Sequence, residues 1–158
     1  MANRSIFWFR RDLRLGDNPA LLSAIAEGDE VVPVFILDPK LIKTAGSKRL
    51  AYLGQSLRLL DESLGNNLHV IAGDQITVLN DLIKRYQVSS VHISAEYEPY
   101  GAKRDTAIEE AGIKLTRTGS PYAVAPGRVR KPSDDTPYRV YTPFYKAWCL
   151  HGWRKPAE

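Results

Sequence analysis

Three short polar segments of this chain combine arginines, carboxylates and tyrosines, and each follows an apolar run. They are Arg10-Arg11-Asp12, Leu37-Asp38-Pro39 and the segment 94–101, which reads Ser-Ala-Glu-Tyr-Glu-Pro-Tyr-Gly. Guanidinium groups bind acidic oxygens through paired hydrogen bonds, carboxylates accept from ring N–H groups, and aromatic side chains stack on flat rings. If the fold brings the three segments together, they suit a planar, polar, conjugated ligand.

Each segment also has a purely structural interpretation. The arginines and Asp12 could form salt bridges that only fix a loop, and Asp38-Pro39 is a common end to a strand with an Asx-type turn. The two tyrosines of the third segment could pack sideways on a following helix. Only the convergence of all three segments would favour a binding site.

Strand and helix patterns alternate along the chain. Leucines at 50, 53, 57, 60 and 64 step by three and four, which marks the longest helix, and Asn18-Pro19 is typical of an N-cap followed by proline. Helices are expected at 18–27, 47–64, 74–86 and 101–111, with a weak helical pattern at 141–148. Strands are expected at 6–9, 31–37, 68–72, 91–94 and 113–118.

Five strands separated by four helices predict an α/β fold. We expect a doubly wound, five-stranded parallel sheet with helices on both faces. In a Rossmann-like or flavodoxin-like order with the first strand central, the loop after it borders the loops after the second and fourth strands. Ligands of such sheets bind at the carboxyl ends of the strands. The three polar segments should therefore meet in one crevice.

Composition excludes several classes of protein. The 158 residues, 44% hydrophobic and 25% charged, are enough for one globular domain, or one domain with a tail. No apolar run approaches the roughly 20 residues of a membrane span, and no signal-peptide core follows the start. The single cysteine, Cys149, excludes an internal disulfide and favours the cytoplasm. The three histidines lack metal-ligand spacing, so we expect no metal. Because no segment could span a bilayer, we also expect no membrane partner.

Sequence motifs of several catalytic classes are missing. There is no Gly-x-Gly-x-x-Gly after the first apolar run, no Walker-type Gly-Lys-Ser/Thr and no Gly-x-Ser-x-Gly elbow. We therefore expect no catalytic residues and no self-contained active site. A basic segment at 128–155, with seven Lys or Arg residues against Asp134 and Asp135, is either a solvated tail or a surface for phosphates.

Six segments, in order, resemble the N-terminal half of the DNA photolyase and cryptochrome flavoproteins. The first, WFRRDLRLGDNPAL at 8–21, resembles the opening of that family, and VVPVFILDP at 31–39 resembles its second strand with the Asp-Pro ending. The others are KRLAYLGQSLRLLDESL at 48–64, LHVIAGD at 68–74, SAEYEPYGAKRD at 94–105 and YRVYTPFYKAW at 138–148.

The resemblance implies that residues 1–125 are a photolyase-type N-terminal α/β antenna domain, which binds a light-harvesting pigment. In the family this pigment passes excitation energy to FAD in a C-terminal helical domain, and the flavin repairs a pyrimidine dimer flipped out of DNA. Residues 126–158 would be a wrapping segment and the start of the interdomain linker. The FAD-binding helical domain and damaged DNA would then be partners of a full-length protein. We favour a shortened chain over a natural stand-alone domain.

The family uses a hydroxy-deazaflavin, a methenyl folate or FMN as its pigment. Where the folate-binding type has Asn-Glu, this chain has Tyr100-Gly101, and its Glu-Pro-Tyr-Gly and Arg49 resemble the deazaflavin-binding type. The resemblance thus favours hydroxy-deazaflavin, with methenyl folate or FMN as alternatives. Arg49 would reach an acidic group and Glu96 would accept from the ring. The implied pigment-binding residues are Arg11, Phe35, Leu37, Asp38, Arg49 and Glu96.

Two other functions remain open at this stage. A cryptochrome photosensory domain would share the same N-terminal half, and a DNA-repair assay on the full-length protein would separate it from a photolyase. A nucleotide-binding domain like that of electron-transfer flavoproteins would bind AMP or FAD instead of a pigment. For the pigment site, we expect Glu96→Ala or Arg49→Ala to weaken uptake and to leave thermal stability nearly unaltered.

Overall fold

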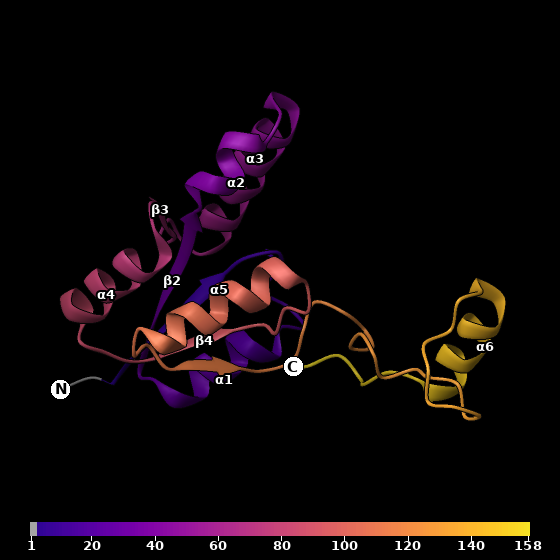
Figure 1. Ribbon diagram of the computed structural model, residues 1–158. Coiled ribbons are helices and arrows are strands. Elements are labelled where there is room, and N and C mark those ends of the chain that lie inside the picture. The colour runs from indigo at the N-terminus through magenta and orange to yellow at the C-terminus, as the bar shows by residue number, and fades with distance from the viewer. Residues whose placement is uncertain (1–2) are drawn as a thin grey trace.

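The computed structural model describes residues 3–158 and has the expected α/β architecture, with one parallel sheet covered by helices (Figure 1). The strand order is β3-β2-β1-β4-β5, and every neighbouring pair is parallel. This is the Rossmann-like order, in which β1 lies between β2 and β4. The strands are β1 (Arg4–Phe9), β2 (Glu30–Leu37), β3 (His69–Ala72), β4 (Val88–Ile93) and β5 (Leu115–Arg117).

Helices cover the two faces of the sheet, and alternate residues of β1 enter two separate cores. Ile6 and Trp8 pack in the core that includes α4 and α5, whereas Phe7 and Phe9 pack in the core that includes α1 and α3. A strand buried on both faces needs a continuous apolar run, which explains the sequence of β1. The helices are α1 (Pro19–Glu27), α2 (Pro39–Thr44), α3 (Ser47–Ser63), α4 (Gln75–Tyr86), α5 (Pro99–Glu110) and α6 (Tyr141–His151).

Capping side chains set where three of the helices begin, next to the ends of strands. Asn18 accepts from the backbone N–H of Leu21 at the start of α1, and Asp74 accepts from that of Thr77 at the start of α4. Asp38 caps α2, a helix that the sequence pattern did not predict, because Asp38-Pro39 was interpreted as a turn. The same pair is an N-cap followed by proline in the first helical position.

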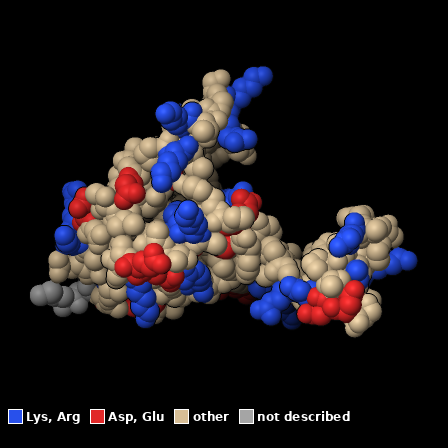
Figure 2. Space-filling model, in the orientation of Figure 1, with Lys and Arg blue, Asp and Glu red and all other residues tan. Residues whose placement is uncertain are grey.

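Gly119 still bonds to the sheet domain through the backbone N–H of Ala95, but the chain after Tyr122 forms an arm that extends away from the sheet and carries α6 (Figure 1). None of the residues of α6 is buried. Its aromatic rings stack on one another instead, as in the pair Tyr145 and Trp148, with centroids 6.4 Å apart. The arm returns to the sheet domain where Arg154 Nη1 lies 2.5 Å from Asp17 Oδ1. Figure 2 shows both basic and acidic side chains on the arm.

The described residues, 3–158, contain no helix that is long and apolar enough to cross a bilayer. Within the same residues, no group of three or more His, Cys, Asp or Glu side chains is placed to hold a metal ion.

Candidate functional site

A cavity of about 250 Å³ lies at the carboxyl ends of β1 and β2, beside the start of α5; we call it the crevice. All three polar segments identified in the sequence contribute to it, so the predicted convergence is confirmed. The residues that line the crevice are Trp8, Phe9, Arg10, Arg11, Phe35, Ile36, Asp38, Leu41, Gln75, Glu96, Glu98, Tyr100, Gly101 and Arg104.

Four of the six implied pigment-binding residues, Arg11, Phe35, Asp38 and Glu96, line the crevice. The other two lie elsewhere. Leu37 packs toward α3 and lines a neighbouring apolar groove of about 430 Å³. Arg49 is exposed in the first turn of α3 and is not part of the crevice lining.

Four charged side chains form a buried cluster at the base of the crevice, which we call the charge cluster: Arg10, Glu96, Arg104 and Asp105. Arg10 Nη1 lies 2.7 Å from Asp105 Oδ1, and Arg10 Nε lies 3.3 Å from Glu96 Oε1. Arg104 Nη2 lies 3.3 Å from Glu96 Oε2 and 2.9 Å from Asp105 Oδ1. All four side chains are at most 12% exposed, so each charge depends on the others for compensation.

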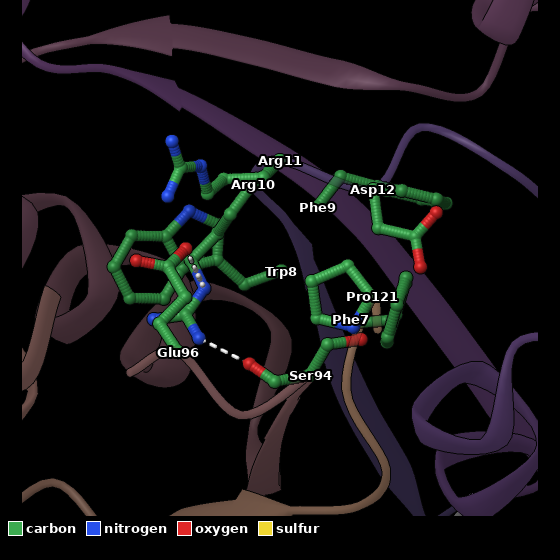
Figure 3. Close-up of a pocket in the computed structure, with 9 residues that line it drawn as sticks. All are labelled: Phe7, Trp8, Phe9, Arg10, Arg11, Asp12, Ser94, Glu96 and Pro121. Atoms are coloured by element: carbon green, nitrogen blue, oxygen red, sulfur yellow. Dashed lines mark hydrogen bonds and ion pairs between the residues drawn. The ribbon is translucent and has the colours of Figure 1, made fainter. Parts of the chain in front are cut away.

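Arg10 is the centre of the charge cluster. Its guanidinium also donates to the backbone carbonyl of Ser94, and Figure 3 shows it joined to Glu96 and Ser94 beside the ring of Trp8. Burial lowers the pKa of Arg10 from its ordinary value, and the nearby charge of Arg104 acts in the same direction. The carboxylates of Asp105 and Glu96 oppose this lowering. Because arginine is effectively always protonated in proteins, the group stays charged.

Both guanidiniums of the charge cluster lie against Trp8. The Arg104 guanidinium carbon is 4.9 Å from the centroid of the Trp8 ring, and that of Arg10 is 5.2 Å from it. These are cation–π distances, at which the ring stabilises both charges. Trp8 therefore links the central strand to α5 and forms a rigid aromatic wall of the crevice.

Asp38 and Tyr100 join β2 to α5 across the crevice. Asp38 Oδ1 accepts from the backbone N–H of Lys40 at 2.8 Å, and Asp38 Oδ2 accepts from the hydroxyl of Tyr100. Burial would raise the pKa of Asp38, but these hydrogen bonds outweigh it and hold the pKa below its ordinary value. Burial and the Asp38 carboxylate together raise the pKa of Tyr100 to about 12.

The rim of the crevice differs from its base. Arg11 Nη1 lies 2.5 Å from Glu98 Oε1, but these side chains are 50% and 55% exposed. The hydrogen bond that Arg11 donates to the Glu98 carboxylate raises the pKa of Arg11. An exposed pair of this kind contributes only about 0–1 kcal/mol to stability. Breaking the pair of Arg11 and Glu98 to bind a ligand would therefore cost little stability. Breaking the buried pairs of the charge cluster would cost much more.

The arrangement is suited to binding. Trp8, Phe35 and Tyr100 supply aromatic surface, while Asp38 and the exposed Arg11 supply an acceptor and a donor at the edges. The sequence pattern placed Trp8 in the core of a strand and gave Arg104 no contact with the crevice. The signals that could have found them are the position of Trp8 two residues before Arg10 and the Arg104-Asp105 pair.

The chain matches the family model described as DNA photolyase over residues 5–158. It is 34% identical over 157 residues to the deoxyribodipyrimidine photo-lyase of a Synechococcus species. This alignment covers 94% of this chain and 32% of that protein. It is 38% identical over 121 residues to cryptochrome-2 of Gallus gallus. This alignment covers 71% of this chain and 21% of that protein.

Solved structures of photolyases also superpose on this chain. A bacterial class III photolyase from Agrobacterium tumefaciens superposes with a TM-score of 0.83 and 32% identity, over 99% of this chain and 33% of that one. An archaeal photolyase from Sulfolobus tokodaii superposes with a TM-score of 0.80 and 32% identity, over 97% of this chain and 36% of that one. The chain thus spans about a third of the length of the photolyases it matches. It belongs to the DNA photolyase family and corresponds to the N-terminal α/β domain of that family.

Proposed function

We propose that this chain binds a light-harvesting pigment in the crevice and acts as the antenna domain of a photolyase. The observation that carries the proposal is the crevice itself, with aromatic walls and exposed polar groups at the carboxyl ends of β1 and β2. A second support is the Sulfolobus tokodaii photolyase, whose structure holds two FAD molecules and is described as implying a novel light-harvesting cofactor.

Within the crevice we assign different roles to the four implied residues. Phe35 packs against the pigment ring, Asp38 accepts from it, and Arg11 binds an acidic oxygen at the rim. Glu96 is held by Arg10 and Arg104, so it positions the crevice wall more than it binds the pigment. The proposal does not extend to Leu37 and Arg49, which lie outside the lining.

We propose a hydroxy-deazaflavin as the pigment, with FMN or a methenyl folate as the alternatives. The support is the Glu-Pro-Tyr-Gly segment, whose Tyr100 closes the crevice by its bond to Asp38. The identity is tested by denaturing the protein as purified from its own host and analysing the released small molecule by mass spectrometry. A released deazaflavin supports the proposal, and a released folate contradicts this assignment of the pigment.

We also propose that residues 1–125 are the antenna unit and that residues 126–158 lead to a FAD-binding helical domain in a longer protein. The exposed aromatic rings of α6, such as Tyr141 at 72% exposed, support a surface that is covered in that protein. The full-length protein would repair pyrimidine dimers in DNA in the cytoplasm, where the exposed Cys149 stays reduced. A light-dependent repair assay distinguishes this activity from cryptochrome signalling.

The binding proposal is tested on the purified, pigment-free chain by fluorescence titration with flavins. Asp38→Asn should raise the dissociation constant by about tenfold or more, because a charge-assisted hydrogen bond contributes about 1.5–3 kcal/mol. Asp81→Asn, at an exposed position of α4, is the matched control and should leave the constant unchanged. Tight binding of AMP with no affinity for a flavin ring would instead favour a nucleotide-binding function.

A further inference from the structure

The chain leaves the sheet domain for the arm, and returns from it, beside the loop between β1 and α1. Before the arm begins, Gly119 lies so close to Pro19 that a Cβ at position 119 would be 2.9 Å from Pro19 Cγ. At the far end of the arm, Arg154 and Ala157 both donate hydrogen bonds to Asp17, and Figure 1 shows that end of the chain back beside the sheet domain. The whole arm is therefore an excursion from one loop and back to it.

Asp17 accepts three hydrogen bonds from the returning chain; we call its contacts with Arg154 and Ala157 the latch. Asp17 Oδ1 lies 2.5 Å from Arg154 Nη1 and accepts from the backbone N–H of Ala157 at 2.7 Å. The backbone carbonyl of Asp17 accepts from Arg154 Nη2 at 3.4 Å. Asp17 has a φ of 50°, in the left-handed region that aspartate and asparagine adopt more readily than most residues. The latch thus depends on a short acidic side chain at a position that few residues fit.

The latch can open while the sheet domain stays folded. The side chains of Asp17 and Arg154 are 35% and 38% exposed. Exposed ion pairs contribute little to stability, and salt screens them further. None of the residues of α6 is buried, so burial of that helix does not hold the arm against the sheet. The position of the arm therefore depends strongly on the latch.

Ion pairs continue from the latch toward the crevice through residues 10–17, which we call the crevice loop. Arg14 Nη1 lies 3.5 Å from Asp17 Oδ2, and Arg14 Nε lies 3.1 Å from Asp12 Oδ1. Asp12 directly follows Arg11, which lines the rim of the crevice. The carboxylate of Asp17 is thus shared between the arm and the loop that carries a crevice residue.

The two arginines at the start of the crevice loop are held differently. Arg10 is fixed in the buried charge cluster. Arg11 is 50% exposed and pairs with the equally accessible Glu98. Because that pair is weak, the position of Arg11 depends on the backbone of the crevice loop.

We propose that Asp17 is a positioning residue of the crevice: the closed latch fixes the crevice loop and with it Arg11, and the open latch releases both. That the crevice takes a ligand rests on the proposed function, whereas the coupling of the arm to the loop does not. Coupling between two equilibria is reciprocal. A ligand held by Arg11 should therefore also favour the closed latch.

Amide hydrogen exchange followed by NMR tests the latch directly, because the backbone N–H of Ala157 is one of its donors. In Arg154→Gln, the Ala157 amide should exchange about fivefold faster or more, because the latch opens more often. The amide signals of Arg11 and Asp12 should shift in the same variant. Arg154→Lys keeps the charge and should restore part of the protection. Lys155→Gln, at the next and exposed position, is the control and should change neither signal.

A second measurement tests the effect on a ligand, with FMN as the probe and the pigment-free chain as the sample. Arg154→Gln should raise the dissociation constant about threefold, because fewer molecules hold Arg11 in place. FMN should in turn slow the exchange of the Ala157 amide in the wild type. The double variant Asp17→Asn/Arg154→Gln should bind FMN like Arg154→Gln alone, since either substitution opens the same latch. Asparagine keeps the left-handed conformation accessible at position 17.

The outcomes separate the latch from the proposed function. An unprotected Ala157 amide in the wild type overturns the proposal, and so does loss of its protection with no shift at Arg11 and Asp12. Equal affinity of wild type and Arg154→Gln for FMN also overturns it. If the exchange and the shifts are as expected but FMN does not bind, Asp17 positions the crevice loop and the binding of a flavin-type pigment fails instead.

Discussion

Gly101 lies so close to Glu96 that no other residue fits at position 101 without displacing the carboxylate. A Cβ built at Gly101 overlaps Glu96 Oε2 and lies 3.0 Å from Glu96 Cβ. Gly101 is in the first turn of α5, and the absence of a side chain there lets the helix start approach Glu96 while Arg10 and Arg104 hold the same carboxylate. The glycine is therefore part of the charge cluster, although it carries no charge.

Gly101→Ala should destabilise the protein by about 1–3 kcal/mol, the usual cost of forcing extra atoms into a packed site. Alanine inside a helix normally stabilises by about 0.5–1 kcal/mol, so the sign of the change is diagnostic. Gly54→Ala in α3 is the matched control, since a Cβ there meets nothing within 4 Å, and it should raise stability. Urea unfolding of both variants measures the difference. If both substitutions stabilise, the close approach to Glu96 has no energetic weight.

Glu96→Gln should lower the free energy of unfolding by about 3–5 kcal/mol, because it leaves two buried guanidiniums short of one negative charge. From the sequence we expected a substitution at Glu96 to leave stability nearly unaltered. Because Glu96 pairs with Arg10 and Arg104 in the structure, we now expect a large loss. Glu98→Gln is the matched control: its pair with Arg11 is half-exposed, so the change should stay below about 1 kcal/mol. Thermal melts decide, and similar losses in the two variants would contradict a special role for the charge cluster.

The hydrogen bond from Tyr100 to Asp38 predicts a change of stability with pH. The pKa of Tyr100 is raised from 10.0 to about 12 in the folded protein, so its contribution is complete below pH 10 and is lost as the pH rises through about 12. The stability difference between wild type and Tyr100→Phe should shrink over this window. Tyr52→Phe, at a residue that is 75% exposed, should show no such window. Parallel curves for wild type and Tyr100→Phe would contradict the bond.

The hydrogen bond from Tyr100 to Asp38 also affects stability at acidic pH. The pKa of Asp38 is lowered in the folded protein, so its contribution is present above the ordinary value of 3.8 and is lost as the pH falls through the folded value. Tyr100→Phe removes one of the hydrogen bonds that lower this pKa. The variant should therefore lose less stability than wild type between about pH 4 and pH 2, as measured by urea unfolding.

His92 should destabilise the fold in mild acid. It is fully buried in β4, with Nε2 3.1 Å from Glu27 Oε2 and 3.0 Å from Ser90 Oγ, and its Nδ1 has no partner among the described residues. Burial lowers its pKa from 6.5 and outweighs the opposing effect of Glu27. The contribution of neutral His92 is therefore present above pH 6.5 and is lost as the pH falls through the lower folded value.

Urea unfolding between pH 7.5 and pH 4.5 measures this effect. His92→Gln should flatten the loss of stability in acid, whereas His151→Gln, at an exposed position of α6, should follow the wild-type curve. An unchanged slope in His92→Gln would show that other groups cause the acid sensitivity.

The sheet could be predicted from sequence because strands buried on both faces leave unbroken apolar runs, as in β1 and β2. The boundaries were harder where polar residues begin an element. β4 starts at Val88, three residues before the prediction, because Ser89 and Ser90 interrupt the apolar pattern. α5 starts at Pro99, two residues before the predicted start at Gly101, because the proline occupies the first helical position.

The crevice could be predicted in part, because the ends of neighbouring parallel strands must meet. Arg11 lies two residues after β1 and Asp38 directly follows β2, so the order of the strands places both at the crevice. Arg104 was missed because it lies in the second turn of α5, and the direction of that helix follows only from packing. Arg49 rested on the resemblance alone, and it lies in the first turn of α3, outside the crevice lining.

The lining of the crevice ends early in the chain: its last member is Arg104, and β5 is complete at Arg117. Proteins are made from the N-terminus, and domains fold as units while synthesis continues. Every residue of the crevice lining and of the sheet is therefore synthesised before the arm. If the crevice binds a pigment as proposed, loading of that pigment would not have to wait for the arm.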